Sequence, residues 1–220
     1  MLIQLTPAEQ RTVLHNISWE TFEALLRDTG EDRGSRFAYD CGTLEIMTPL
    51  FEHENPKIQI ERFILVLAEE LDIQIISAGS TTLKRKLAKR GIEPDACYYI
   101  QNELAIRGKE TLDLETDPPP DLAIEIDITN SSVNKFGIYS ALDVPELWRY
   151  NGEDLKFYHL VEGQYLECEF SVAFPLVSVN EIKRFIQQSK NMGEIALLKS
   201  FRYWVRKKEE NLDVDYYCSY

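Results

Sequence analysis

Residues 121–129 read Asp121-Leu-Ala-Ile-Glu-Ile-Asp-Ile-Thr129, and their alternation predicts a β-strand with two different faces. One face carries Leu122, Ile124, Ile126 and Ile128, and the other carries Ala123, Glu125, Asp127 and Thr129. A buried strand holds two carboxylates on one face only if their charge is compensated, because burying an unpaired charge is very costly. A metal ion, a basic side chain or water at an open cleft would compensate it. All three are features of catalytic sites.

A second explanation of the same strand needs no site. Antiparallel sheets commonly leave one face in water, and carboxylates also occur in purely structural networks. Residues 121–129 alone leave both explanations open.

The composition predicts a folded protein without a membrane span. The chain has 220 residues, of which 44% are hydrophobic and 11% aromatic, which is enough for a sizeable core and excludes disorder as the main state. No apolar run approaches the roughly 20 residues that cross a bilayer. The first residues, Met-Leu-Ile-Gln-Leu-Thr-Pro, lack the basic and apolar regions of a secretory signal. We therefore expect a cytoplasmic protein.

The cysteines do not predict a disulfide framework or a zinc site. Cys41, Cys97, Cys168 and Cys218 are widely spaced and include no C-x-x-C pair. We expect reduced thiols.

Charge argues against non-specific adhesion to a polyanion. The net charge is −13, whereas nucleic-acid binding depends largely on neutralising phosphates with basic residues. One segment is basic: Lys84, Arg85, Lys86, Lys89 and Arg90. This segment is either a solvated strand end and turn or a contact for phosphate.

The remaining pattern predicts one mixed α/β domain over residues 1–220, with a core at about 18–170 and a C-terminal helical segment at about 180–210. We expect helices at residues 18–26, from Asn55-Pro56 to Leu71, and at residues 131–142, 180–189 and 194–210. The second helix carries one apolar stripe of Ile60, Ile64, Leu67 and Leu71. The last helix is expected to pack through one side, which carries Ile195, Leu198, Phe201 and Val205. We expect strands at residues 36–40, 43–47, 73–77, 81–87, 95–100, 121–129, 146–150, 155–160 and 164–170. Residues 108–120, which end in three prolines, are expected to form a loop.

Asp95 and Glu125 are the candidate metal ligands. Asp95 begins one predicted strand, and Glu125 lies in the middle of another, across the long loop. If the two strands pair, the carboxylates are close enough to hold Mg²⁺ or Mn²⁺, because such an ion often takes only one or two carboxylates, with water and substrate phosphate as its other ligands. Asp127 faces the same way as Glu125 and is a further candidate.

Lys135 lies with Ile138, Tyr139 and Leu142 on one face of the predicted helix at 131–142. Its ammonium either snorkels to water or reaches the carboxylates and offsets negative charge there. His53 is either a surface residue or a ligand or proton carrier at the mouth of the cleft. Glu45 is a secondary candidate at the same cleft.

Other chemistries fit less well. The sequence has no G-x-S-x-G, P-loop, G-x-G-x-x-G after a strand or H-E-x-x-H motif. The Asp95 and Glu125 pair could serve a glycosidase, but an inward lysine and a basic segment suit phosphate better.

The order of several motifs resembles the Uma-type restriction endonuclease family of the PD-(D/E)XK nuclease superfamily. The motifs are Gly42-x-Leu-Glu-x-Met-x-Pro49, His53, Glu93-Pro-Asp95, residues 121–129, Lys135, Tyr139 and Val144-Pro-Glu-Leu-Trp-Arg-Tyr150. The resemblance runs from about Trp19 to Arg206 and implies a restriction-endonuclease-like fold, a central mixed β-sheet flanked by helices, in a protein that is often a homodimer. It also implies that Asp95 and Glu125 hold a divalent metal.

The chain departs from the superfamily pattern at one position. The superfamily lysine falls at position 127, where this chain has Asp127. In the Uma-type pattern a lysine lies on the following helix, and Lys135 matches that position.

The leading hypothesis is therefore a Mg²⁺-dependent endonuclease acting on nucleic acid, with DNA as substrate, in which the segment from Lys84 to Arg90 contacts phosphate. A catalytically degenerate interaction or regulatory module with the same fold is the alternative. Metal-dependent hydrolysis of a small phosphorylated molecule is the third hypothesis.

Overall fold

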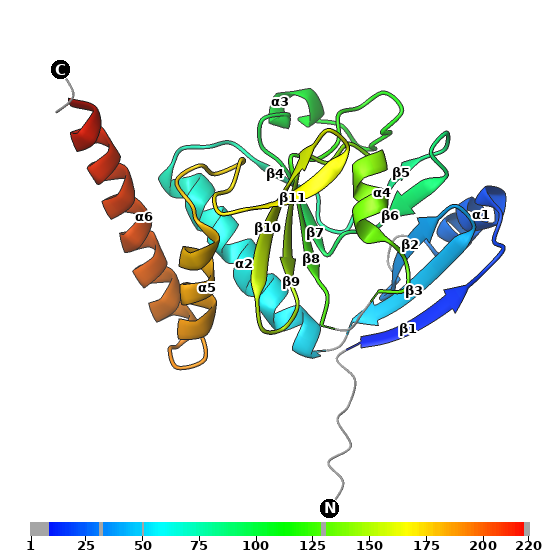
Figure 1. Ribbon diagram of the computed structural model, residues 1–220, viewed down its shortest axis with the longest axis horizontal. Coiled ribbons are helices and arrows are strands. Elements are labelled where there is room, and N and C mark those ends of the chain that lie inside the picture. Colours follow the sequence, from blue (N-terminus) through cyan, green and yellow to red (C-terminus); the bar gives the residue numbers. More distant parts are fainter. Residues whose placement is uncertain (1–8, 31–32, 50, 129–130, 218–220) are drawn as a thin grey trace, which may run out of the picture.

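The computed structural model describes residues 9–30, 33–49, 51–128 and 131–217, without the side chains of residues 9, 51–53 and 211–217. Its strands form two sheets that lie beside each other (Figure 1). The first is antiparallel, in the order β1 (Glu9–Leu14), β3 (Thr43–Pro49), β2 (Arg36–Asp40), β6 (Arg90–Ile92) and β5 (Leu83–Arg85). The second is mixed, in the order β11 (Gln164–Cys168), β10 (Leu155–Val161), β9 (Glu146–Tyr150), β8 (Leu122–Ile126), β7 (Ala96–Tyr99) and β4 (Ile76–Ser77).

Six helices accompany the sheets in the described residues: α1 (Trp19–Thr29), α2 (Phe51–Glu70), α3 (Glu103–Ile106), α4 (Lys135–Ala141), α5 (Val179–Gln188) and α6 (Glu194–Tyr217). The predicted α/β class with helices on the sheet faces is confirmed, but the strands divide between two sheets instead of one. Pro94 separates β6 from β7, and a proline has no N–H for a strand ladder. The chain therefore leaves the first sheet at Ile92 and enters the second at Ala96.

Alternation along β2 directs side chains of the first sheet to two different cores. Phe37 and Tyr39 face α1, where the Tyr39 ring stacks on Phe22 with centroids 4.8 Å apart. Ala38 faces the opposite way, into the core around α4. The first sheet is thus covered by α1 on one face and by α4 on the other.

All residues of β8 are buried, and its two faces meet different helices. Leu122, Ile124 and Ile126 pack in the core with α2, α5 and α6, whereas Ala123 packs with α4. The predicted division of this strand into two faces is confirmed from Leu122 to Asp127, and Thr129 lies outside the described residues.

Helix α2 confirms the predicted stripe, since Ile60, Ile64 and Leu67 are fully buried. It begins at Phe51, about one turn before the predicted start, so Pro56 lies inside the helix. The proline has a helical φ angle but no N–H, so the helix lacks one backbone hydrogen bond at this position.

Helix α4 lies between the two sheets (Figure 1). Ile138, Tyr139 and Leu142 are fully buried, as their shared face predicts. The N-cap is Asn134, whose side chain accepts a hydrogen bond from the Gly137 N–H at 3.1 Å, and the helix starts later than the predicted residue 131.

Three elements were not predicted: β1, β6 and α3. Strand β6 and helix α3 are too short to show a periodic pattern, and β1, Glu-Gln-Arg-Thr-Val-Leu, does not alternate between polar and apolar residues. The basic segment forms a hairpin of β5 and β6, in which Leu83 pairs with Ile92 and Arg85 with Arg90. None of the helices in the described ranges combines the length and apolarity of a membrane span.

The C-terminal helix α6 is part of the main core. Leu197, Phe201 and Val205 are buried against α2 and α5, and Glu70 of α2 forms ion pairs with Arg202 and Arg206. The prediction that Ile195 packs on this face is wrong, since it is 67% exposed.

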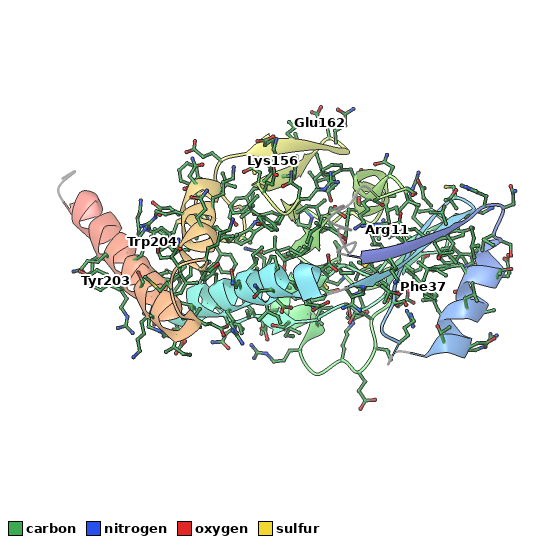
Figure 2. The ribbon with its side chains drawn as sticks, turned by 90° about the horizontal axis from the view of Figure 1, so that it is seen from below. Arg11, Phe37, Lys156, Glu162, Tyr203 and Trp204 are labelled. Carbon is green, nitrogen blue, oxygen red and sulfur yellow. The ribbon has the colours of Figure 1, made fainter. Side chains whose placement is uncertain are left out.

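Helix α6 has a buried side and an exposed side, which the neighbours Tyr203 and Trp204 illustrate in Figure 2. Trp204 packs against Phe185 and Phe201, whereas Tyr203 is 65% exposed.

We expect Phe201→Ala to lower the free energy of unfolding by about 3–5 kcal/mol, because it leaves a cavity between α2, α5 and α6. Tyr203→Ala, two residues away on the exposed side, should change it by less than about 0.5 kcal/mol. Urea unfolding of the two variants measures both values. Equal effects would mean that α6 is not packed as described.

Candidate active site

Asp95 and Glu125 come together because β7 and β8 are antiparallel neighbours. Ala96 pairs with Ile124, so Asp95, one residue before β7, falls opposite Glu125. The Oδ2 atom of Asp95 accepts the N–H of Ile126 at 2.7 Å, which fixes the carboxylate beside β8. Both carboxyl groups are almost completely buried, at 2% and 3% exposure.

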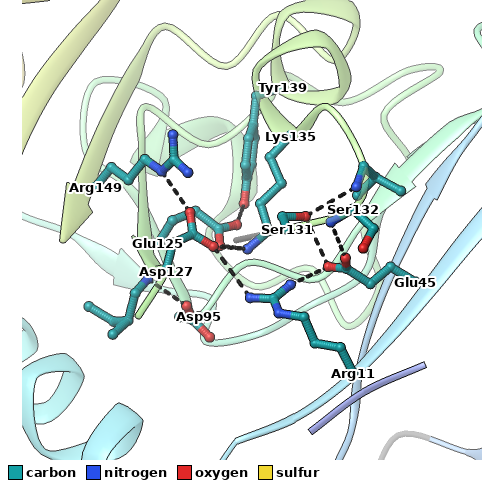
Figure 3. Close-up of polar contacts among 12 residues, drawn as sticks. Arg11, Glu45, Asp95, Glu125, Asp127, Ser131, Ser132, Lys135, Tyr139 and Arg149 are labelled. Carbon is teal, nitrogen blue, oxygen red and sulfur yellow. Dashed lines mark hydrogen bonds and ion pairs between the residues drawn. The ribbon is translucent and has the colours of Figure 1, made fainter. Parts of the chain in front are cut away.

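The ammonium of Lys135 lies between the carboxylates of Glu125 in β8 and Asp127 just after it (Figure 3). It donates to Oε2 of Glu125 and, at 2.7 Å, to Oδ1 of Asp127. Only 12% of the lysine side chain is exposed, so it does not snorkel to water. Lys135 is the first residue of α4, and the face it shares with Ile138 and Tyr139 directs it inward.

Tyr139, one turn along α4, donates its hydroxyl to the other oxygen of Glu125. Burial raises the pKa of Glu125 above its usual value, and the charges of Asp95 and Asp127 add to the rise while Lys135 opposes it. Burial also raises the pKa of Tyr139, as does the nearby Glu125. Tyr139 therefore remains a neutral hydrogen-bond donor to Glu125.

Asp127 occupies the position where the resemblance calls for a lysine, and three basic side chains surround it. Lys135 donates a hydrogen bond to Oδ1 of Asp127, and Nε of Arg149 donates to Oδ2 at 2.7 Å. The guanidinium of Arg11 forms a longer ion pair, with its Nη2 atom 3.7 Å from Oδ1. Burial alone would raise the pKa of Asp127, but Lys135 and Arg149 outweigh it and hold the pKa below its usual value. Burial alone would lower the pKa of Lys135, but the carboxylates of Glu125 and Asp127 raise it above its usual value. Asp127 is therefore ionised and Lys135 is protonated.

Arg149 reaches this position because β9 runs parallel to β8, with Arg149 paired to Glu125. Arg11 reaches it from the first sheet, where it also forms an ion pair with Glu45. Residues from both sheets thus contribute to one charged cluster.

Glu45 connects the first sheet to the segment before α4. It is 2% exposed and accepts hydrogen bonds from the Ser131 hydroxyl at 3.0 Å and the Ser132 N–H at 2.6 Å (Figure 3). The residue predicted as a secondary candidate therefore lies next to the cluster and positions the chain that leads to Lys135.

A cavity of about 250 Å³ opens beside this cluster. Its lining consists of Glu125, Asp127, Lys135, Tyr139, Arg149, Ser131, Val133, Asn134, Phe136 and Leu147. The cluster is therefore accessible to a ligand even though its carboxylates are nearly buried.

The basic residues that were predicted to contact phosphate do not line this cavity. The hairpin of β5 and β6 contacts the far end of α4, where Arg85 donates to the Ala141 carbonyl oxygen at 2.8 Å, about 9 Å along the helix from Lys135. Three of its basic residues are in ion pairs: Lys84 with Glu23, Arg85 with Asp143 and Arg90 with Asp40. Lys86 and Lys89 are exposed. The His53 backbone is in the first turn of α2, and its side chain lies outside the described residues.

Sequence reasoning missed Arg11 and Arg149 as members of the site. Arg149 lies in an otherwise buried strand, Glu146–Tyr150. A basic residue in such a strand needs an acidic partner, so this arginine could have been predicted as a partner of the carboxylates. Arg11 lies in the unpredicted strand β1 and gave no such signal. Burial raises the pKa of Glu61 of α2, and the charges of Glu54 and Asp95 add to the rise while Lys57 opposes it.

The donors present suit a small, hard cation. Within the described ranges no group of three or more acidic, histidine or cysteine side chains converges as a metal site. Asp95 and Glu125 supply two carboxylates, which suffices for Mg²⁺ when water and a phosphate oxygen complete its coordination. These two residues fit the ion that the resemblance implies.

A comparison with protein families supports the assignment that the motifs suggest. The Uma2 family, described as "Putative restriction endonuclease", matches residues 19–186, which is well over half of the chain. No curated protein matches the chain. The match includes Asp95, Glu125, Asp127, Lys135 and Arg149, and the α/β architecture is that of a restriction-endonuclease-like fold. The chain belongs to the Uma2 family of restriction-endonuclease-like proteins.

Proposed function

We propose that this protein is a Mg²⁺-dependent endonuclease that hydrolyses phosphodiester bonds in nucleic acid, with DNA as its substrate. The observation that supports it most strongly is the position of Lys135, whose ammonium contacts Glu125 opposite Asp95. Two acidic residues and one lysine are the constellation of the PD-(D/E)XK superfamily, and here the lysine comes from α4. Membership of the Uma2 family supports nuclease chemistry in general.

Asp95 and Glu125 would hold the metal, since both are buried carboxylates and the register of β7 and β8 places them opposite each other. When bound, Mg²⁺ lowers the pKa of a coordinated water and stabilises negative charge on the phosphate oxygens. The N–H of Ile126 and the hydroxyl of Tyr139 keep the two carboxylates in place. Preorganised ligands of this kind need little rearrangement during the reaction.

Lys135 would act as a cation and not as a base. Its raised pKa keeps Nζ protonated, so it cannot take a proton from the attacking water at neutral pH. An ammonium in this nearly buried position orients that water and offsets the charge that develops on phosphate. Asp127 and Arg149 act through Lys135 and Glu125 as positioning residues. The homodimer that the resemblance implies stays a prediction, which sedimentation velocity would test.

We expect Asp95→Asn and Glu125→Gln each to reduce metal-dependent cleavage to below about 1% of the wild-type rate, because each removes a proposed ligand. The assay is nicking of plasmid and of single-stranded DNA with Mg²⁺ or Mn²⁺. Glu167→Gln is the matched control, since this carboxylate is 56% exposed on β11. If the wild type shows no metal-dependent cleavage, or the site variants cleave as fast as the control, the proposed function is wrong.

We expect Lys135→Met to lower the cleavage rate by about 10²–10³-fold, because charge on the phosphate is no longer offset. Lys156→Met, whose side chain is 42% exposed, should leave the rate unchanged. Since Lys135→Met leaves buried carboxylates unpaired, the charge-balanced double variant Lys135→Met/Asp127→Asn is measured beside it. Wild-type rates in the folded double variant would contradict a catalytic role for Lys135.

One feature favours a non-enzymatic alternative. Lys135 and Tyr139 already satisfy both oxygens of Glu125, as they would in an interaction module that never binds metal. Calorimetric titration with Mn²⁺ distinguishes the two. The endonuclease proposal expects saturable binding that Glu125→Gln abolishes, and the alternative expects none in either protein.

A further inference from the structure

The cavity beside Lys135 has a size that suits a single small group. Its volume of about 250 Å³ equals roughly eight water molecules at about 30 Å³ each. It lies below the range of about 300–1,000 Å³ that is usual for sites of drug-sized ligands. A base pair would not fit into it, whereas one heterocyclic ring system would.

One wall of the cavity is aromatic and rigidly held. The Phe136 ring packs edge-on against Tyr158, with centroids 4.9 Å apart, and lies 5.5 Å from the Tyr165 ring. The guanidinium of Arg149 lies over the Phe136 ring, 5.2 Å from its centroid. Leu147 and Val133 complete the apolar lining. Flat apolar and guanidinium surfaces of this kind are those on which nucleic-acid bases stack.

The polar side of the cavity lies toward the proposed reaction centre. Glu125, Asp127 and Lys135 line it directly. The side chain of Arg149 is 35% exposed, and its Nε donates a hydrogen bond to Asp127. A guanidinium carries five N–H groups, so Arg149 has other donors besides Nε. A phosphate at Lys135 would therefore have an aromatic and guanidinium wall within one nucleotide of it.

We propose that this cavity binds one unstacked base of the substrate strand, next to the phosphate that is cleaved. The inference rests on the proposed function and names its substrate class: a strand that is single or locally unpaired. A base inside a continuous duplex is stacked on both sides and cannot enter a cavity, so duplex would first have to release a nucleotide. The nucleic acid is recognised by stacking, which tolerates any base, and by its phosphate charge.

The test compares binding with and without bases at constant charge. Wild-type protein is titrated, in Ca²⁺ instead of Mg²⁺, into a fluorescent oligothymidylate and into an abasic strand of the same length, with fluorescence anisotropy as the readout. Both strands carry the same phosphates, so any preference comes from the bases. We expect the wild type to bind the oligothymidylate about tenfold more tightly than the abasic strand, and more tightly than a duplex of equal length.

Two substitutions connect this preference to the cavity. Phe136→Leu keeps an apolar wall without an aromatic face, and it should bring the ratio of the two dissociation constants close to one. Phe136→Trp should restore the preference. Phe170→Leu is the control, because this ring is 53% exposed and does not line the cavity. Equal binding of both strands by the wild type, or an unchanged preference in Phe136→Leu, would overturn the inference.

The outcomes for the cavity and for the activity are separable. If the protein prefers the base-bearing strand but cleaves no nucleic acid, the base-binding cavity is supported and the proposed nuclease activity is wrong. If the protein cleaves but binds both strands equally, the nuclease activity is supported and the base-binding cavity is wrong.

Discussion

The two buried carboxylates at the end of β8, Glu125 within the strand and Asp127 directly after it, impose the charge balance on which the site depends. Glu125 and Asp127 are 3% and 5% exposed, and leaving one such charge unpaired by removing its partner costs about 3–5 kcal/mol. Lys135 from α4 and Arg149 from β9 supply the compensation, with Arg11 from β1 nearby. The elements that carry these cations must therefore meet at β8, and this requirement links the two sheets and α4.

The same arrangement explains how Asp127 can stand where a lysine is expected. The negative charge of Asp127 is balanced, because its carboxylate accepts hydrogen bonds from Lys135 and Arg149. Asp127 thus holds the ammonium that contacts Glu125, and positive charge at the site arises from α4 instead of β8. We infer that the departure moves the lysine without removing its charge from the centre.

Local patterns predicted what depends on neighbouring residues in the chain. The alternation in residues 121–129 identified both faces of β8, and the inward position of Lys135 is one of the two that its shared face with Ile138 and Tyr139 left open. The expectation that Asp95 and Glu125 lie together if their strands pair was also confirmed, because β7 and β8 are consecutive strands and are antiparallel neighbours. The predicted stripe of α2 was confirmed, although the start of the helix was not.

Long-range pairing could not be predicted in this way. Arg149 reaches Asp127 only because β9 is parallel to β8, and Arg11 only because β1 pairs with β3. No local pattern specifies which strands become neighbours. The division into two sheets follows from Pro94, which separates β6 from β7. The sequence showed this proline within the Glu93-Pro-Asp95 motif, but its effect on strand pairing was not predicted. The basic hairpin was recognised as charged, yet its ion pairs with Glu23, Asp40 and Asp143 depend on residues far away in the chain.

A crystal grown with Mn²⁺ tests the central claim most directly, because anomalous scattering locates the ion without any assay of activity. The account predicts one Mn²⁺ bound by the carboxylates of Asp95 and Glu125, at about 2.0–2.2 Å as for a small hard cation, with Nζ of Lys135 still in contact with Asp127. A cluster of the same geometry without bound Mn²⁺, or an ion held by other residues, would contradict it.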